Sequence, residues 1–212
     1  MDGNGRWAQA RGLARTAGHV EGVKSVRACT EQAVRRGIRY LSIFAFSEEN
    51  WGRPSDEVGS LMELMGSEVE REVSLFMEND IRFLVLGNKD RLPMPLRLAI
   101  EGLETATASH TTLTLIVFLS YSGRWDISQA AVRMAEAGDT DISKYLITAG
   151  IPDPDLLIRT SGEQRISNYL LWQTAYTEFY FTDTLWPDFR EKEFDLALDA
   201  FVQRDRRYGK VK

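Results

Sequence analysis

Apolar segments of strand type alternate with helical segments along this chain, and this alternation constrains the fold more than any other feature. Strand-type runs cover residues 38–46, 81–86, 113–121 and 155–160. Helical patterns cover residues 19–36, 56–78, 95–108, 125–137 and 190–206. The run 113–121 is nearly continuous in apolar residues, which is typical of a strand covered on both faces. The order predicts an α/β fold with a mostly parallel central sheet flanked by helices.

The longest helical pattern, residues 56–78, follows Pro54. Ser55 suits the N-cap position, and the acids Asp56 and Glu57 favour the positive end of the helix dipole. The apolar residues of one face follow a spacing of three and four: Val58, Leu61, Met62, Met65, Val69, Val73 and Phe76. We expect one continuous helix of roughly 34 Å.

The composition indicates one globular domain over residues 1–212. Hydrophobic residues make up 43% and charged residues 27% of the chain, and neither repeats nor linkers divide it. The net charge of -5 gives no support to nucleic-acid binding, which rests on clustered cations. Cys29 is the single cysteine, so it has no internal disulfide partner and a reducing cytoplasm is the expected compartment.

Neither a structural zinc site nor a membrane span is expected. The one cysteine and two histidines are too few for a zinc site, so a bound metal would be a hard cation on carboxylates and phosphates. No stretch approaches the roughly 20 apolar residues that cross a bilayer, and the N-terminus lacks the apolar core of a signal peptide. Any membrane contact is expected to be peripheral.

The first candidate site lies near the start of the chain. Residues 3–20 contain three arginines and one histidine but no acid, together with glycines that let backbone amides approach a ligand: Arg6, Arg11, Arg15 and His19, with Gly3, Gly5 and Gly12. If the segment is helical from about residue 11, then Arg11, Arg15 and His19 share one face. Amides and stacked cations suit a diphosphate. The alternative is a solvated basic face beside an ordinary turn, because no P-loop motif is present.

The second candidate site is the segment 159–167, which follows an apolar strand. It offers Arg159 and Arg165, hydroxyl groups and a glycine at a strand end, where ligands of α/β sheets bind. It predicts a second diphosphate site, and an ion-pair network with Glu163 and Glu178 is the alternative. Together, the two clusters suggest two anionic substrates held side by side.

Asp2 and the segment 47–54 add to this picture. A carboxylate beside a phosphate site repels its ligand unless a divalent cation lies between them, so Asp2 is either a metal ligand or a simple turn residue. The segment 47–54 is polar around one tryptophan and suits a mobile active-site loop, although an inert connection has the same composition.

Several blocks, in order over essentially the whole chain, resemble the cis-prenyltransferase family, with the bacterial undecaprenyl diphosphate synthases as the nearest pattern. The blocks are Met1-Asp-Gly-Asn-Gly-Arg-Trp-Ala8, Gly18-His19, Phe46-Ser-Glu-Glu-Asn-Trp-Gly-Arg-Pro54, Gly123-Arg-Trp-Asp126, Asp155-Leu-Leu-Ile-Arg-Thr-Ser-Gly-Glu-Gln-Arg-Ile-Ser167 and Phe181-Thr-Asp183. The resemblance implies repeated condensation of isopentenyl diphosphate onto an allylic diphosphate such as farnesyl diphosphate, with Z double bonds. The product would be undecaprenyl diphosphate, a lipid-carrier precursor for cell-wall synthesis, made in a hydrophobic tunnel between the sheet and the long helix. Ala45, a small residue, would lie at the tunnel mouth.

The same resemblance implies roles for individual residues. Those that would hold the allylic diphosphate are Gly3, Asn4, Gly5, Arg6, Arg15 and His19. Those that would hold isopentenyl diphosphate are Arg159, Arg165 and Ser167. Further substrate contacts would come from Trp7, Ser47, Glu49, Trp51 and Arg53. Asp2 and Asn50 would be catalytic, and Asp2 and Glu178 would bind Mg²⁺. The released diphosphate and a loop residue are both candidates for the base.

The resemblance also implies a homodimer, since Arg207-Tyr-Gly209 matches a motif that reaches the partner subunit's active site. Asp-rich DDxxD motifs of trans-type synthases are absent. This sequence departs from the family pattern in two places. The family has an apolar first strand before the Asp-Gly-Asn-Gly block, and that strand is expected to be missing here. The family usually has Asn and Gly around the end of the third strand, where this chain has Ile116, Ser120 and Ser122. A short- or medium-chain synthase, a non-catalytic subunit of the same family and an unrelated phosphate-ligand binder remain alternatives.

Overall fold

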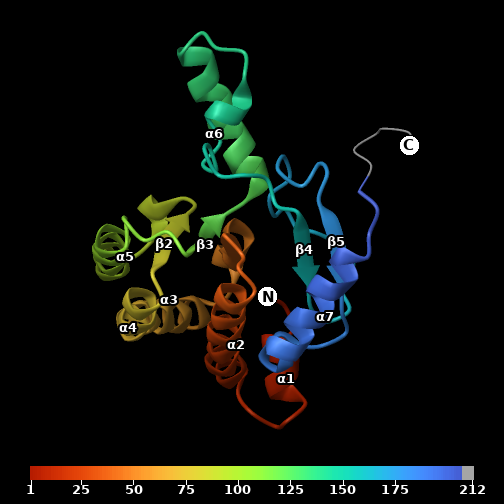
Figure 1. Cartoon of the computed structure of the whole chain (residues 1–212). Coiled ribbons are helices and arrows are strands. Elements are labelled where there is room, and N and C mark those ends of the chain that lie inside the picture. The colour runs from red at the N-terminus through yellow and green to blue at the C-terminus, as the bar shows by residue number, and fades with distance from the viewer. Residues whose placement is uncertain (207–212) are drawn as a thin grey trace.

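The computed structural model describes residues 1–206 and has the predicted α/β architecture (Figure 1). Three parallel strands form one sheet in the order β1 (Tyr40–Ser47), β3 (Leu113–Tyr121) and β2 (Ile81–Leu86). A separate sheet pairs β4 (Leu156–Arg159) with β5 (Glu178–Phe181), also in parallel. The strand β5 was not predicted, because its four residues are too short for a periodic signal.

Seven α-helices in the described residues surround these sheets. They are α1 (Asn4–Gln9), α2 (Arg15–Arg35), α3 (Ser55–Arg71), α4 (Val73–Glu78), α5 (Met94–Ala106), α6 (Gly123–Glu136) and α7 (Glu191–Val202). Short 3₁₀ turns connect them at η1 (Glu48–Gly52), η2 (Lys89–Arg91), η3 (Ile142–Lys144) and η4 (Trp186–Asp188). In Figure 1, α2 lies between the β1–β3–β2 sheet and α7, while α6 projects away at the top. Within residues 1–206, no helix is long and apolar enough to cross a membrane.

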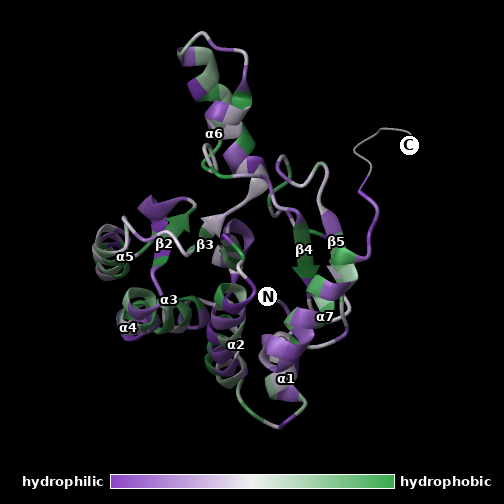
Figure 2. Cartoon of the chain, viewed as in Figure 1, coloured by the Kyte–Doolittle hydropathy of each residue, from purple (hydrophilic) through white to green (hydrophobic). Residues whose placement is uncertain are grey.

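The strand β3 lies at the centre of the larger sheet and carries side chains into two clusters. Leu113, Leu115 and Leu119 join the core formed with α2, α3, α4 and α5, whereas Ile116 and Phe118 pack on the opposite face. All five are at most 3% exposed. Because residues on both faces are buried, the prediction of a strand covered on both faces is confirmed. Fully burying one such side chain stabilises the fold by about 1.5–3 kcal/mol. Figure 2 shows that β4 is mostly hydrophobic, whereas α1 is largely hydrophilic.

The expected continuous helix over 56–78 is wrong. The helix α3 ends at Arg71, and α4 begins at Val73. Between them Glu72 has φ -88° and ψ 2°, outside the helical range, and its buried carboxylate accepts hydrogen bonds from Arg27 of α2. This contact is tertiary, so the local spacing of apolar residues does not register it. Ser55 is the first residue of α3, and Pro54 occupies the N-cap position.

The expected stack of Arg11, Arg15 and His19 is wrong as well. The chain forms α1 first, turns at Gly12, whose φ is 65°, and resumes as α2 at Arg15. Arg15 and His19 share a face of α2, but Arg11 lies outside that helix. A left-handed glycine ends regular helix, which explains the interruption.

Candidate active site

A cavity of about 1100 Å³ lies among α2, α3, the β1–β3–β2 sheet and β4. Its apolar walls come from the sheet and from α2, α3 and α4, so the predicted hydrophobic cavity between the sheet and the long helical segment is present. Most of the predicted site residues line it: Asp2, Gly3, Asn4, Gly5, Arg6, Arg15, His19, Ser47, Glu49, Asn50, Arg53, Arg159, Arg165 and Ser167. Trp7, Trp51 and Glu178 are not among the lining residues.

Asp2 is held at the carboxyl end of β4. Its backbone N–H donates to Thr160 Oγ1 at 2.9 Å, and the Thr160 hydroxyl donates to the Asp2 carbonyl at 2.8 Å. Its carboxylate accepts from the Gly3 N–H at 2.8 Å and from Arg159 Nη2 at 3.1 Å. Partial burial raises the pKa of the carboxyl, but these two hydrogen bonds and the nearby guanidiniums outweigh it and lower the pKa below its usual value. Asp2 is therefore an anion bordered by cations.

Gly3 must be glycine at this point in the chain. Its φ is 103°, and a Cβ would lie 2.8 Å from the side chain of Leu185. The tight turn lets α1 begin directly after Asp2, so the Gly-rich segment brings Asp2 and Arg6 to the same end of the cavity. Arg6 Nη1 donates to the Ser161 carbonyl at 3.2 Å, which joins α1 to the segment after β4.

Arg159 organises the segment after β4. Its side chain is 13% exposed, and besides Asp2 it donates to Ser167 Oγ at 2.8 Å and to the Arg165 carbonyl. Ser161 and Ser167 have φ of 74° and 48°, values that side-chain-bearing residues seldom adopt outside functional loops. The segment therefore folds back over the end of β4 and turns its cations toward the cavity.

Glu163 connects the two cationic clusters. It pairs with Arg165, and it lies 3.1 Å from Arg6. The ion-pair alternative is thus realised at Glu163, but Glu178 pairs instead with Arg204 at 2.8 Å. The Arg165 side chain is 60% exposed, so this exposed pair is worth little and its guanidinium is available to an anion.

The residues His19 and Asn4 carry buried polar atoms without partners. In the part of the chain that the structure describes, His19 Nε2 and Asn4 Oδ1 make no hydrogen bond. Burial, aided by the charge of Arg53, lowers the pKa of His19. An unpaired buried polar atom costs about 1–3 kcal/mol, and both residues line the cavity, so a hydrogen bond from a ligand there would offset this cost.

The turn η1 presents two faces. Asn50 Oδ1 accepts from the Ser47 N–H at 3.0 Å, which shapes the turn, and Glu49 accepts from Asn168 at 2.7 Å. Ser47, Glu49 and Asn50 line the cavity, together with the adjacent Arg53.

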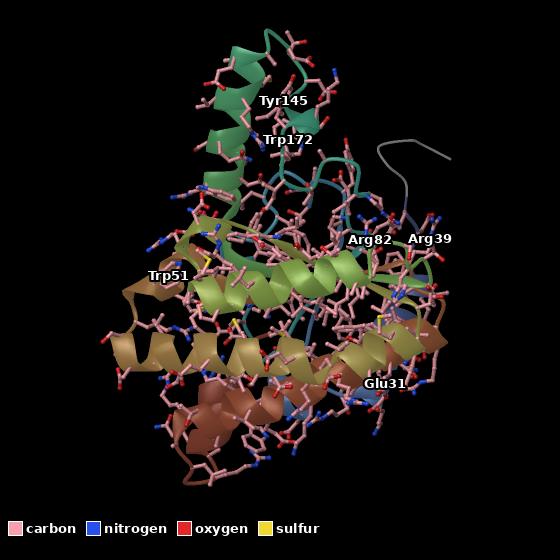
Figure 3. All side chains as sticks on the ribbon, turned by 90° about the vertical axis from the view of Figure 1, so that its left-hand side faces the viewer. Glu31, Arg39, Trp51, Arg82, Tyr145 and Trp172 are labelled. Carbon is pink, nitrogen blue, oxygen red and sulfur yellow. The ribbon has the colours of Figure 1, made fainter. Side chains whose placement is uncertain are left out.

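The opposite face of η1 is anchored to the neighbouring strands. Trp51 Nε1 donates to Ser120 Oγ at 2.9 Å, and the Arg91 guanidinium lies 4.7 Å from the centre of the Trp51 ring. Glu48 pairs with Arg91 and accepts from Ser120. Figure 3 labels Trp51 beside the start of α5. Trp51 thus anchors the turn from outside the cavity, a role that sequence reasoning missed because it depends on Ser120 and Arg91 of other strand ends.

Trp7 also points away from the cavity. Its indole N–H donates to Asp188 at 2.7 Å, and Arg11 covers its ring at 4.1 Å. Its predicted substrate contact therefore has no support in its placement.

The donor set around Asp2 suits one kind of metal. Among residues 1–206, no three His, Cys, Asp or Glu side chains gather into a metal cluster. A single carboxylate beside an anion site fits Mg²⁺, which is commonly held by one or two carboxylates plus substrate phosphates. Glu178, engaged with Arg204 outside the cavity lining, is not placed with Asp2. Arg207 and Gly209 lie outside the described residues.

Comparisons with known proteins agree with this geometry. The family model described as "Putative undecaprenyl diphosphate synthase" matches residues 1–209. The isoprenyl transferase of Fusobacterium nucleatum is 50% identical, over 100% of this chain and 94% of that protein. The isoprenyl transferase of Geobacter sulfurreducens is 47% identical, over 100% of this chain and 90% of that protein.

Two solved structures are similar over nearly their full lengths. Lavandulyl diphosphate synthase from Lavandula x intermedia, in complex with dimethylallyl diphosphate, superposes with a TM-score of 0.96 at 37% identity, covering 99% of this chain and 95% of that one. A probable undecaprenyl diphosphate synthase from Campylobacter jejuni gives 0.83 at 33% identity, with coverage of 90% and 93%. The chain belongs to the undecaprenyl diphosphate synthase family of isoprenyl transferases.

Proposed function

We propose that residues 1–212 form one catalytic domain that condenses isopentenyl diphosphate repeatedly onto an allylic diphosphate, with Z stereochemistry. The observation that carries this proposal is the pairing of two cationic clusters with one apolar cavity. Arg6, Arg15 and His19 line the cavity from α1 and α2, and Arg159 and Arg165 line it from β4 and the segment after it. Asp2 contacts both clusters, 3.7 Å from Arg6 and 3.1 Å from Arg159. Two diphosphates side by side would bring the allylic carbon and the isopentenyl double bond together, while the apolar cavity receives the hydrocarbon.

In this proposal the allylic diphosphate binds the cluster of α1 and α2, and isopentenyl diphosphate binds the segment 159–167. The reaction breaks the allylic carbon–oxygen bond, so negative charge develops on the departing diphosphate. Arginines and the amides of the Gly-rich turn would stabilise that charge. Ser47, Asn50 and Arg53 of the loop would cover the substrates and exclude water.

Mg²⁺ belongs to the proposal as the cation beside Asp2. When bound there it would neutralise diphosphate charge and assist departure of the leaving group. Asp2, kept ionised by Arg159 and Gly3, is the residue that would hold it.

The apolar length of the cavity favours a long-chain product, and the proposal is farnesyl diphosphate as primer with undecaprenyl diphosphate, a carrier precursor for cell-wall synthesis, as product. The proposal further includes a homodimer involving Arg207 and Gly209, and a cytoplasmic enzyme that releases its product at a membrane surface. A short-chain synthase is the second candidate, favoured by the likeness to lavandulyl diphosphate synthase and its short allylic ligand.

Incubation with farnesyl diphosphate, isopentenyl diphosphate and Mg²⁺, followed by sizing of the products, tests the proposal. We expect long polyprenyl diphosphates; products that stop after one or two additions would support the short-chain candidate. The Asp2→Ala variant should lose most Mg²⁺-dependent turnover while remaining folded. Asp199→Ala is a matched control, because Asp199 is an exposed acid that pairs with Arg36 outside the cavity. Near-normal rates in Asp2→Ala would remove Asp2 from the metal site.

A further inference from the structure

Three charged side chains interrupt the apolar part of the cavity. Arg27 of α2, Glu68 of α3 and Glu72 after α3 all belong to its lining. Most of the other residues that these two helices contribute in the same region are apolar, among them Val23, Val26, Leu64, Met65 and Val69. Thr30 of α2 is polar, but its hydroxyl donates to a backbone carbonyl of its own helix. A cavity that receives hydrocarbon has no evident use for charges at this depth, so their position calls for an explanation.

Arg27 and Glu72 form a bridge between α2 and the end of α3. Arg27 Nη1 lies 3.3 Å and 3.4 Å from the two carboxylate oxygens of Glu72. Glu72 is 8% exposed, so its charge is compensated chiefly by this arginine. The bridge lies at the residue that separates α3 from α4.

Glu68 stands one turn before Glu72 and is less well compensated. Its Oε2 lies 2.9 Å from Arg71 in an ion pair without hydrogen-bond geometry, and that oxygen has no other partner among the described residues. Burial raises the pKa of the Glu68 carboxyl; the Arg71 charge opposes this shift, and the weaker influence of the Glu72 charge adds to it. Glu68 is therefore a partly desolvated acid on the cavity wall.

These charges lie far from the diphosphate end. Arg15 at the start of α2 and Arg53 just before α3 are 3.8 Å and 3.2 Å from the same carboxylate, Glu57, so both helices begin at the cationic clusters. Arg27 is twelve residues beyond Arg15, and Glu68 is thirteen beyond Ser55, or about 18 Å and 20 Å along the helices. In Figure 3, α3 runs from the side where Trp51 is labelled toward the side where Glu31 is labelled, and Glu31 contacts Arg27.

We propose that Glu68 and the Arg27–Glu72 bridge set the maximum length of the product. A chain growing from the cationic end meets apolar walls until it reaches these charges. To pass between α2 and α3, it would have to strip water from Glu68 or separate Glu72 from Arg27. The Arg27 side chain is 51% exposed, so the unfavourable part of this separation is the buried Glu72 carboxylate left without its partner. Further units must then coil in the remaining space, and elongation stops when that space is filled. This inference rests on the proposed function.

Three variants test it, with farnesyl diphosphate and isopentenyl diphosphate as substrates and the product distribution as the readout. Glu68→Gln removes the charge at nearly constant size, and Glu68→Ala removes both charge and bulk. The double variant Arg27→Met with Glu72→Met removes both members of the bridge together. Glu31, which also contacts Arg27, keeps Arg35 as a partner, and Arg71 keeps Glu68. Glu70→Gln, an exposed acid on α3 outside the cavity lining, is the matched control.

We expect all three variants to shift the most abundant product by one or more isoprene units toward longer chains. The kcat/KM of the first condensation should stay within about twofold of the unmodified enzyme, because the diphosphate sites are untouched. The Glu70→Gln control should keep the original distribution. Circular dichroism and the thermal midpoint establish that each variant is folded. If the double variant does not fold, Glu68→Gln, which is the mildest change, still tests the proposal.

Two results would overturn the inference. One is an unchanged product distribution in Glu68→Gln and in the double variant. The other is lengthening in Glu68→Ala but not in Glu68→Gln, which would make the limit one of size rather than charge. If the unmodified enzyme forms no polyprenyl product, the proposed function itself fails, and that outcome is distinct from both.

Discussion

Gly18→Ala tests whether the close approach of α1 to α2 shapes the active site. A Cβ on Gly18 would lie 2.0 Å from the carbonyl oxygen of Asn4 and 2.7 Å from its carbonyl carbon. Both are backbone atoms, so no side-chain rotation relieves the clash, and α1 must move by about 1 Å or more. Overpacking of this kind costs about 1–3 kcal/mol, while replacing glycine within a helix returns about 0.5–1 kcal/mol. We expect a net loss of about 1–2 kcal/mol in the free energy of unfolding.

The displacement should also reduce activity, because α1 carries Asn4 and Arg6. A misplacement of about 1 Å in positioning groups can lower the rate by about a hundredfold. Urea unfolding and kcat/KM for isopentenyl diphosphate incorporation measure the two effects. Gly59→Ala on α3 is the matched control: no atom lies within 4 Å of its added Cβ, so it should stabilise the fold by about 0.5–1 kcal/mol and leave kcat/KM unchanged. A Gly18→Ala variant as stable and active as the unmodified enzyme would refute the reasoning.

Three further predictions concern Arg159, Ser120 and His19. Arg159→Ala should reduce kcat/KM by about 10–150-fold through lost charged hydrogen bonds, mainly when isopentenyl diphosphate is varied; a loss confined to the allylic substrate would reverse the two sites. In Ser120→Ala, η1 loses the hydrogen bond that Trp51 Nε1 donates to the Ser120 hydroxyl. The KM should therefore rise about fivefold and acrylamide should quench Trp51 fluorescence more strongly, with little change in the thermal midpoint. A bound diphosphate should raise the lowered pKa of His19, so His19 takes up a proton on binding. The calorimetric affinity for the allylic diphosphate should therefore rise as the pH falls from the pKa of His19 in the complex toward its lower pKa in the free enzyme, more than in His19→Gln; equal pH dependence would contradict this.

Much of the site could be predicted because its signals are local. The glycines and cations of residues 3–20, and the arginines at the end of the fourth predicted strand and after it, predicted two cationic clusters without knowledge of their partners, and both clusters line the cavity. Their juxtaposition was inferred from strand ends and family blocks. The structure adds the contact itself, since Arg159 reaches Asp2 across 157 positions in the chain.

The errors share a physical origin. Periodicity reports which residues of one helix face the core, but it does not report which charge a second helix supplies. The pattern over 56–78 therefore predicted one helix, although the helix is interrupted at Glu72, where the side chain contacts Arg27 of α2. For the same reason, the contacts of Trp51 with Ser120 and Arg91 could not be predicted from its own segment, and its substrate contact stays a prediction.

By itself, the sequence determined the α/β class, the doubly covered strand β3 and the two cationic clusters, because each depends on propensity, spacing and composition within a short segment. Tertiary structure alone decided the break at Glu72, the division of η1 into two faces and the charges that line the far part of the cavity. Those features depend on contacts between segments that are distant along the chain. The free energies of such contacts exceed the secondary-structure propensities of single residues by a few kcal/mol.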